Sequence, residues 1–218
     1  MEKLIRGIVD FRKNLTEESR ELFAKLALGQ KPDTLFIACS DSRVVPNLFA
    51  STNPGDLFVL RNIGNLIPPY SATYEDTSAS ACIEFAIFTL KVQDIVVCGH
   101  SECGAIRALA EGMDLSDSPH LKTWLKYGEE SLTIVRNGFV INPALTEQNQ
   151  ISQVNVLQQM ANISSYPFIH DRIQKKKLRV HGWWFDIAHA DVYCYEPTVG
   201  EFVMIDEKEA KLILERLK

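Results

Sequence analysis

The chain has little of three features that often decide a protein's class. None of its apolar runs approaches the roughly 18 residues that a membrane helix needs, so no membrane span is expected. Its 23 basic residues are outnumbered by 28 acidic ones, giving a net charge of −5. That balance argues against nucleic acid or an anionic membrane as the main partner. Its five cysteines are an odd number at irregular spacing, which argues against a disulfide framework.

The composition otherwise suits one folded domain. The chain has 218 residues, of which 46% are hydrophobic and 23% charged, so we expect a single domain over residues 1–218. The first ten residues include acidic side chains and no apolar signal-peptide core, which predicts a cytoplasmic location. In a reducing compartment, cysteines that matter are more often ligands or nucleophiles than disulfide partners.

Short apolar runs alternate with helical patterns through the middle of the chain. Residues 34–38, 57–60 and 94–98 predict three buried strands. Helical segments between them predict an α/β fold whose central, mostly parallel sheet is flanked by helices. Residues 178–185 and 192–195 predict an antiparallel hairpin that extends this sheet.

The N-terminal segment, residues 1–29, is predicted to form a helical arm. Leu4, Ile5, Ile8 and Phe11 share one helical face. Because this segment precedes the first strand, it has no obvious place inside a compact α/β core. Two interpretations remain: the arm packs on a second subunit, or it covers its own sheet.

Two polar motifs follow two of the predicted strands. Cys39 begins the stretch Cys-Ser-Asp-Ser-Arg, and His100 and Cys103 lie in His-Ser-Glu-Cys. The carboxyl ends of parallel strands meet at one edge of a sheet, where ligands gather. Two thiolates and one imidazole are donors that zinc prefers. The spacing therefore predicts a zinc site, the alternative being a packed turn with incidental thiols.

Asp41 and Arg43 follow Cys39 closely, and the residues alone leave two roles for Asp41. As a fourth ligand it would close the tetrahedron and exclude water. Paired with Arg43 instead, it would leave one coordination position open for catalysis.

The same motifs give the chain a family resemblance. Cys-Ser-Asp-Ser-Arg, His-Ser-x-Cys-Gly, the Arg-Asn-x-x-Asn segment (Arg61, Asn62, Asn65) and the preceding Pro-Gly-Asp are similar to those of β-class carbonic anhydrases over roughly residues 28–195. The resemblance implies one zinc per chain, held by Cys39, His100 and Cys103. It also implies that Asp41 is a ligand that exchanges with water and that Arg43 draws it off the metal.

The reaction implied is reversible hydration of CO₂ to bicarbonate and a proton, by a zinc-bound hydroxide that the Asp41–Arg43 pair orients. Phe36 and Ala38 depart from the bicarbonate-inhibited subtype, which has tryptophan and glycine there. Gln30 and Phe58 match the pocket of the plant-like subtype, whose site opens readily. Phe85 stands where that subtype has a pocket tyrosine, so a hydroxyl is missing.

The resemblance also implies a homodimer or homotetramer with the active site at the subunit boundary. Two alternative functions stay open, namely hydrolysis of CS₂ or COS on the same zinc fold, and a zinc-stabilised binding protein without catalysis. The other histidines and cysteines are expected to be surface, hairpin or core residues rather than ligands. They are His120, His170, His181, His189, Cys82, Cys98 and Cys194.

Overall fold

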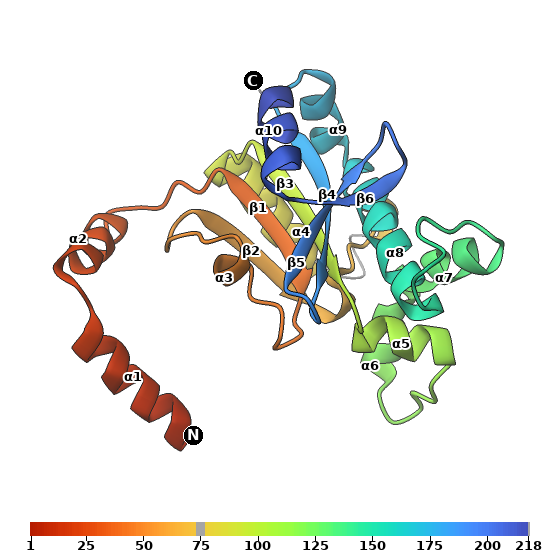
Figure 1. Ribbon diagram of the computed structural model, residues 1–218, viewed down its shortest axis with the longest axis horizontal. Coiled ribbons are helices and arrows are strands. Elements are labelled where there is room, and N and C mark those ends of the chain that lie inside the picture. Colours follow the sequence, from red (N-terminus) through yellow and green to blue (C-terminus); the bar gives the residue numbers. More distant parts are fainter. Residues whose placement is uncertain (73–76, 218) are drawn as a thin grey trace.

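The computed structural model describes residues 1–72 and 77–217, and one six-stranded sheet organises it (Figure 1). The strand order is β2-β1-β3-β4-β5-β6. Strands β2, β1, β3 and β4 run parallel, whereas β5 and β6 are antiparallel additions at one edge. The strands are β1 (Thr34–Cys39), β2 (Leu57–Asn62), β3 (Asp94–His100), β4 (Arg179–Asp186), β5 (Asp191–Glu196) and β6 (Glu201–Met204). The predicted α/β class and the hairpin are confirmed.

Helices connect the parallel strands and cover the sheet. The α-helices are α1 (Glu2–Asn14), α2 (Glu17–Leu26), α3 (Pro46–Phe49), α4 (Thr77–Glu84), α5 (Gly104–Glu111), α6 (Pro119–Leu125), α7 (Glu129–Arg136), α8 (Glu147–Ser164), α9 (Pro167–Gln174) and α10 (Glu207–Arg216). Short 3₁₀ turns are η1 (Ile63–Asn65), η2 (Tyr70–Ala72) and η4 (Lys126–Gly128), and η3 (Phe85–Leu90) is a π-helical segment.

The central strands are buried on both faces, which explains their unbroken apolar runs. Leu35 and Ile37 of β1 belong to the core that includes Ile83 of α4 and Val156 of α8. Phe36 and Ala38, which alternate with them, point to the opposite face and pack beside Phe185. Successive side chains of β1 therefore enter different cores. A shift of one residue would exchange them, so their burial fixes the register of β1.

Two details differ from the expectation. Strand β6 was not predicted, because its four residues include only a short apolar stretch and it lies half-exposed at the sheet edge. The helix predicted after Thr77 changes into π-helical turns at Phe85. In this wider segment the Val92 N–H reaches the Ala86 carbonyl at 3.2 Å, and Ala86 and Ile87 are both fully buried.

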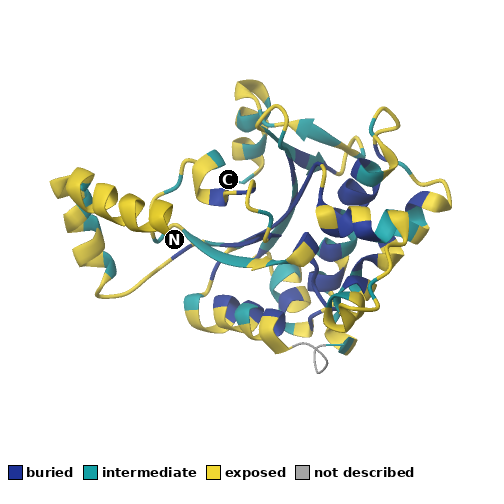
Figure 2. Ribbon diagram, turned by 90° about the horizontal axis from the view of Figure 1, so that it is seen from below, coloured by how far each residue is buried: buried dark blue, intermediate teal, exposed yellow. Residues whose placement is uncertain are grey.

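The arm extends away from the sheet. Figure 1 shows α1 and α2, in red, projecting to one side, and Figure 2 shows them exposed along their length. Neither helix has a buried residue, and Leu4 and Ile8 are 65% and 63% exposed. An edge-to-face contact between Phe11 and Phe23 joins the two helices. The interpretation in which the arm covers its own sheet is therefore wrong for this chain.

Candidate metal centre

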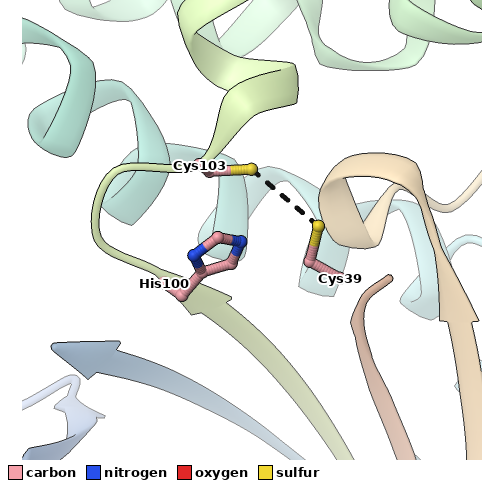
Figure 3. A group of neighbouring side chains, drawn as sticks. All are labelled: Cys39, His100 and Cys103. Carbon is pink, nitrogen blue, oxygen red and sulfur yellow. Dashed lines mark hydrogen bonds between the residues drawn. The ribbon is translucent and has the colours of Figure 1, made fainter. Parts of the chain in front are cut away.

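Cys39, His100 and Cys103 converge at the carboxyl edge of the sheet (Figure 3). Cys39 ends β1 and His100 ends the neighbouring parallel strand β3, while Cys103 is the N-cap residue of α5. All three are buried, and their ligand atoms lie within 4.8 Å of one another. The two Sγ atoms are 4.0 Å apart. Two sulfurs on a tetrahedral zinc, with Zn–S bonds of about 2.3 Å, would lie about 3.8 Å apart.

The His100 ring has one nitrogen ready to bind a cation. Its Nδ1 lies 2.8 Å from the Ser101 carbonyl oxygen. A carbonyl only accepts, so Nδ1 carries the proton and Nε2 presents its lone pair. Among the described residues, Nε2 has no hydrogen-bond partner although the ring is fully buried. Because an orphaned buried acceptor is costly, this atom and the two sulfurs fit a zinc ion.

The two thiols share one hydrogen bond, which favours ionisation at Cys39. The two sulfurs lie within hydrogen-bond distance and either can be the donor. This contact with Cys103 is the main reason that the pKa of Cys39 is lowered despite its burial. The same bond raises the pKa of Cys103. The Gly64 N–H also donates to Cys39 Sγ at 3.3 Å. A bound cation would replace the shared proton and hold both sulfurs as thiolates.

Asp41 lies beside the ligands but is held by Arg43. Arg43 donates from Nε to Oδ1 at 2.9 Å and from Nη2 to Oδ2 at 2.7 Å. The Arg43 hydrogen bond holds the pKa of Asp41 well below its usual range. Asp41 Oδ2 is 4.0 Å from His100 Nε2. The carboxylate is therefore ionised and near the ligands, and both of its oxygens are engaged by the guanidinium.

Arg61 and Asn62 shape the two loops around the site, a role that the sequence did not reveal. Arg61 donates to the carbonyl oxygens of Cys39, Asp41 and Val44 at 2.6–3.0 Å. The Asn62 amide bonds both the N–H and the carbonyl of Leu66, which closes the turn containing Gly64. Both residues lie in the Arg-Asn-x-x-Asn motif, so the motif was the available signal.

The structure does not bring the expected pocket residues to the ligands of the same chain. Phe58 pairs with Leu35, four residues before the register pair of Asn62 and Cys39. At roughly 3.3 Å per residue, that is about 13 Å along the strand. The Phe85 ring contacts Phe58 at a centroid distance of 5.7 Å, and Gln30 lies exposed between α2 and β1. These three residues gather toward the amino end of the sheet.

The remaining histidines and cysteines behave differently from His100. Cys98 and Cys194 are buried and Cys82 packs against the core. His181 contacts Asp94 at 2.8 Å and His189 contacts Asp186 at 2.6 Å. These carboxylate contacts were not predicted, because one crosses between strands and the other bridges a turn. Over the described residues, the clustered metal-ligating groups are those of the Cys39, His100 and Cys103 set.

Comparison with known proteins decides the family. The carbonic anhydrase family pattern matches residues 34–192, well over half of the chain. The chain belongs to the β-carbonic anhydrase family. The carbonic anhydrase of Synechocystis is 38% identical over 211 residues, which cover 93% of this chain and 74% of that protein. The carbonic anhydrase of Helicobacter pylori strain J99 is 36% identical, covering 92% and 93%.

Solved β-carbonic anhydrases share the fold. The β-carbonic anhydrase CcaA superposes with a TM-score of 0.87 at 37% identity, covering 95% of this chain and 93% of its own. A tetrameric β-carbonic anhydrase from Sordaria macrospora gives 0.71 at 31% identity, covering 88% and 92%. Among the described helices, none is long and apolar enough to cross a membrane.

Proposed function

We propose that this β-carbonic anhydrase chain catalyses reversible hydration of CO₂ to bicarbonate and a proton, with one zinc ion held by Cys39, His100 and Cys103. One observation carries the proposal: the buried Nε2 of His100 has no described hydrogen-bond partner and faces two cysteine sulfurs. An ion held there would act as a Lewis acid that lowers the pKa of a coordinated water.

Asp41 and Arg43 supply the polar groups beside that position. An ionised carboxylate only accepts hydrogen bonds. Asp41 would accept a hydrogen bond from the attacking oxygen and so turn a lone pair of that oxygen toward CO₂. Arg43 keeps Asp41 ionised and oriented through two hydrogen bonds. A zinc-stabilised binding protein needs neither residue, so this pair favours catalysis.

We assign the readily opened subtype. The support is geometric: both Asp41 oxygens are engaged by Arg43, and Asp41 is not in the clustered ligand set. Three protein ligands then leave the fourth position to water, as catalytic zinc sites require. In the closed alternative, Asp41 would complete the tetrahedron.

Gln30, Phe58 and Phe85 are proposed to line the substrate pocket of a neighbouring subunit. Phe58 and Phe85 contact each other far from the ligands of their own chain. A pocket built from both subunits would use them, with Phe85 contributing an apolar ring and no hydroxyl. The partner in this proposal is a second copy, so the enzyme is a homodimer or homotetramer.

The arm supports this assembly. In our proposal the chain is one domain, and its arm over residues 1–29 packs on the second subunit. The apolar face of α1, with Leu4, Ile5, Ile8 and Phe11, is more than half exposed at each residue. A face of this size is normally covered. An Ile8→Lys change should shift the protein toward smaller species in analytical ultracentrifugation, whereas an unchanged mass would argue against this contact.

The proposed location is the cytoplasm.

The deciding experiment measures metal and activity together. Zinc content by elemental analysis should reach one ion per chain, and stopped-flow hydration of CO₂ should disappear when a chelator strips the ion. Separate assays with CS₂ and COS distinguish the two gas-hydrolase alternatives. Zinc-loaded protein that hydrates none of these gases would refute the proposed catalysis.

A further inference from the structure

Glu102, between two of the proposed ligands, has an unusual backbone conformation. Its φ is +54°, in the left-handed region, and it is not a glycine. Such a conformation costs free energy in a residue with a Cβ and persists where surrounding contacts hold it. The contacts that hold Glu102 therefore bear on the geometry of the metal centre.

Asn149, in the first turn of α8, contacts Glu102 with both sides of its amide. The Glu102 N–H donates to Asn149 Oδ1 at 2.9 Å, and Asn149 Nδ2 donates to Glu102 Oε1 at 3.0 Å. Asn149 is only 8% exposed, and its own N–H lies 3.4 Å from the Oγ1 of the N-cap residue Thr146. A buried amide on a capped helix is a firm support for an exposed loop residue.

Glu102 in turn holds Arg43. The Arg43 Nη2 donates to the Glu102 carbonyl oxygen at 3.0 Å and to Asp41 Oδ2 at 2.7 Å. The same guanidinium nitrogen therefore bridges the strained loop and the carboxylate. Arg43 is about half exposed at its side chain, so the carbonyl is the fixed point that limits its motion.

We propose that Asn149 is a positioning residue for Arg43. Through Glu102, it holds the guanidinium where it keeps Asp41 off the metal, and so sets the fraction of molecules whose fourth coordination position is open. This inference rests on the proposed function, because it assumes a metal at Cys39, His100 and Cys103. Asn149 would thus influence how often the fourth coordination position is open without touching metal or substrate.

Neighbouring residues of α8 have a different task. Ser152 Oγ donates to the His100 carbonyl at 2.7 Å, and Gln148 Nε2 donates to the Cys103 carbonyl at 3.0 Å. These bonds hold the ligand residues themselves. Loss of the Asn149 amide leaves both in place, so metal binding should survive while the position of Arg43 changes.

The test uses Co²⁺-substituted full-length protein and azide as the probe of the open position. Azide needs a coordination position that Asp41 does not fill, and its binding changes the visible Co²⁺ spectrum. Asn149→Leu removes the amide without changing charge. We expect azide to bind about fivefold more weakly at one fixed pH, the scale of one ordinary, uncharged hydrogen bond. The thiolate-to-Co²⁺ charge-transfer bands should remain, which shows that the cysteines still bind.

Two further variants make the result decisive. Gln158→Leu is the control, because it removes another amide from α8 that is not bonded to the ligand loops. The Gln158 amide donates to Glu130 at 2.8 Å. The azide affinity of this variant should match that of the wild type. In Glu102→Gly, the glycine adopts the left-handed backbone conformation without strain. The hydrogen bond from the Asn149 amide to the Glu102 carboxylate is lost. Removing its negative charge would strengthen azide binding by simple electrostatics, whereas our proposal expects weaker binding. If Asn149→Leu does not fold, Glu102→Gly decides.

The possible failures are distinguishable. Azide affinity that is unchanged in Asn149→Leu, or stronger in Glu102→Gly, would overturn the positioning role while leaving the proposed enzyme intact. Wild-type protein that takes up no Co²⁺, or shows no thiolate charge-transfer bands, would instead refute the metal centre itself.

Discussion

The two ends of β3 carry two polar clusters that differ in one respect. At its first residue, Asp94 accepts hydrogen bonds from Arg179 at 2.7 Å and contacts His181 Nε2 at 2.8 Å. At its last residue, His100 presents a buried Nε2 with no partner among the described residues. The first cluster satisfies its own charges. The second leaves a buried acceptor without a partner beside two sulfurs, as a cation site would, which is why we interpret it as a functional site.

Two residues beside the second cluster have left-handed backbone conformations. Glu102, next to the second cluster, is held in a left-handed conformation, and Gly64, with φ +78°, donates to Cys39. At the first cluster, Asp94 and Arg179 sit in register on regular parallel strands. The ion pair is therefore formed within regular strands, whereas the ligands meet in loops, one of which holds Glu102 in a costly conformation.

The largest effect is expected when one of the three proposed zinc ligands is removed. His100→Ala removes one of three ligands and should reduce zinc from one per chain to a trace, with hydration falling to the uncatalysed rate. Two sulfurs alone cannot enclose a four-coordinate ion. The matched control is His181→Ala at the opposite end of the sheet, which should keep its zinc. Full zinc occupancy in His100→Ala would mean that the metal lies elsewhere.

A smaller effect is expected when the ligands are kept and the carboxylate is removed. Asp41→Ala should retain zinc while turnover falls about 10²- to 10⁴-fold, the range for loss of a positioned proton acceptor. Elemental analysis and stopped-flow hydration, run on the same preparation, separate the two quantities. If the zinc leaves with the side chain, Asp41 is chiefly a structural ligand and the site is closed.

The pH dependence sharpens the assignment further. Hydration should rise about tenfold from about pH 7 to about pH 9, because two thiolates donate more charge than imidazoles and keep the pKa of the attacking water above the ~7 of three-histidine sites. Arg43 holds the pKa of Asp41 below its usual range. Asp41 is therefore ionised throughout this window, and its titration cannot produce the rise. A flat stopped-flow profile would contradict the mechanism.

Local patterns in the sequence were enough to predict five of the six strands and the meeting of Cys39, His100 and Cys103. Cys39 and His100 each end an apolar strand, and parallel strands bring such ends together. What was missed depends on contacts between distant residues. Asn149 lies 47 positions from Glu102, and Arg61 binds carbonyls whose direction only the folded loop defines. Neither periodicity nor motif spacing reports such bonds. The pocket residues illustrate the same limit, because their relation to the ligands depends on a second copy of the chain.

The smallest effect is expected at the first cluster, in which Asp94 is paired with Arg179 and His181. Burial alone would raise the pKa of Asp94, but hydrogen bonds from His181 and Arg179 outweigh it and lower the pKa to about 2. A depressed pKa stabilises the fold fully above the unfolded value of about 4, and this stabilisation is lost as pH falls toward 2. Asp94→Asn should therefore lower the free energy of unfolding at neutral pH by about 1–2 kcal/mol.

Urea unfolding at a series of pH values checks this, and the gap between variant and wild type should narrow steadily below about pH 4. Arg179 also donates to the Leu217 carbonyl at 3.1 Å, so the C-terminal end of α10 should become more open to proteolysis. Zinc content and hydration per folded chain should not change. A variant that loses metal along with stability would show that the two ends of β3 are coupled, and the division between a structural and a functional cluster would then fail.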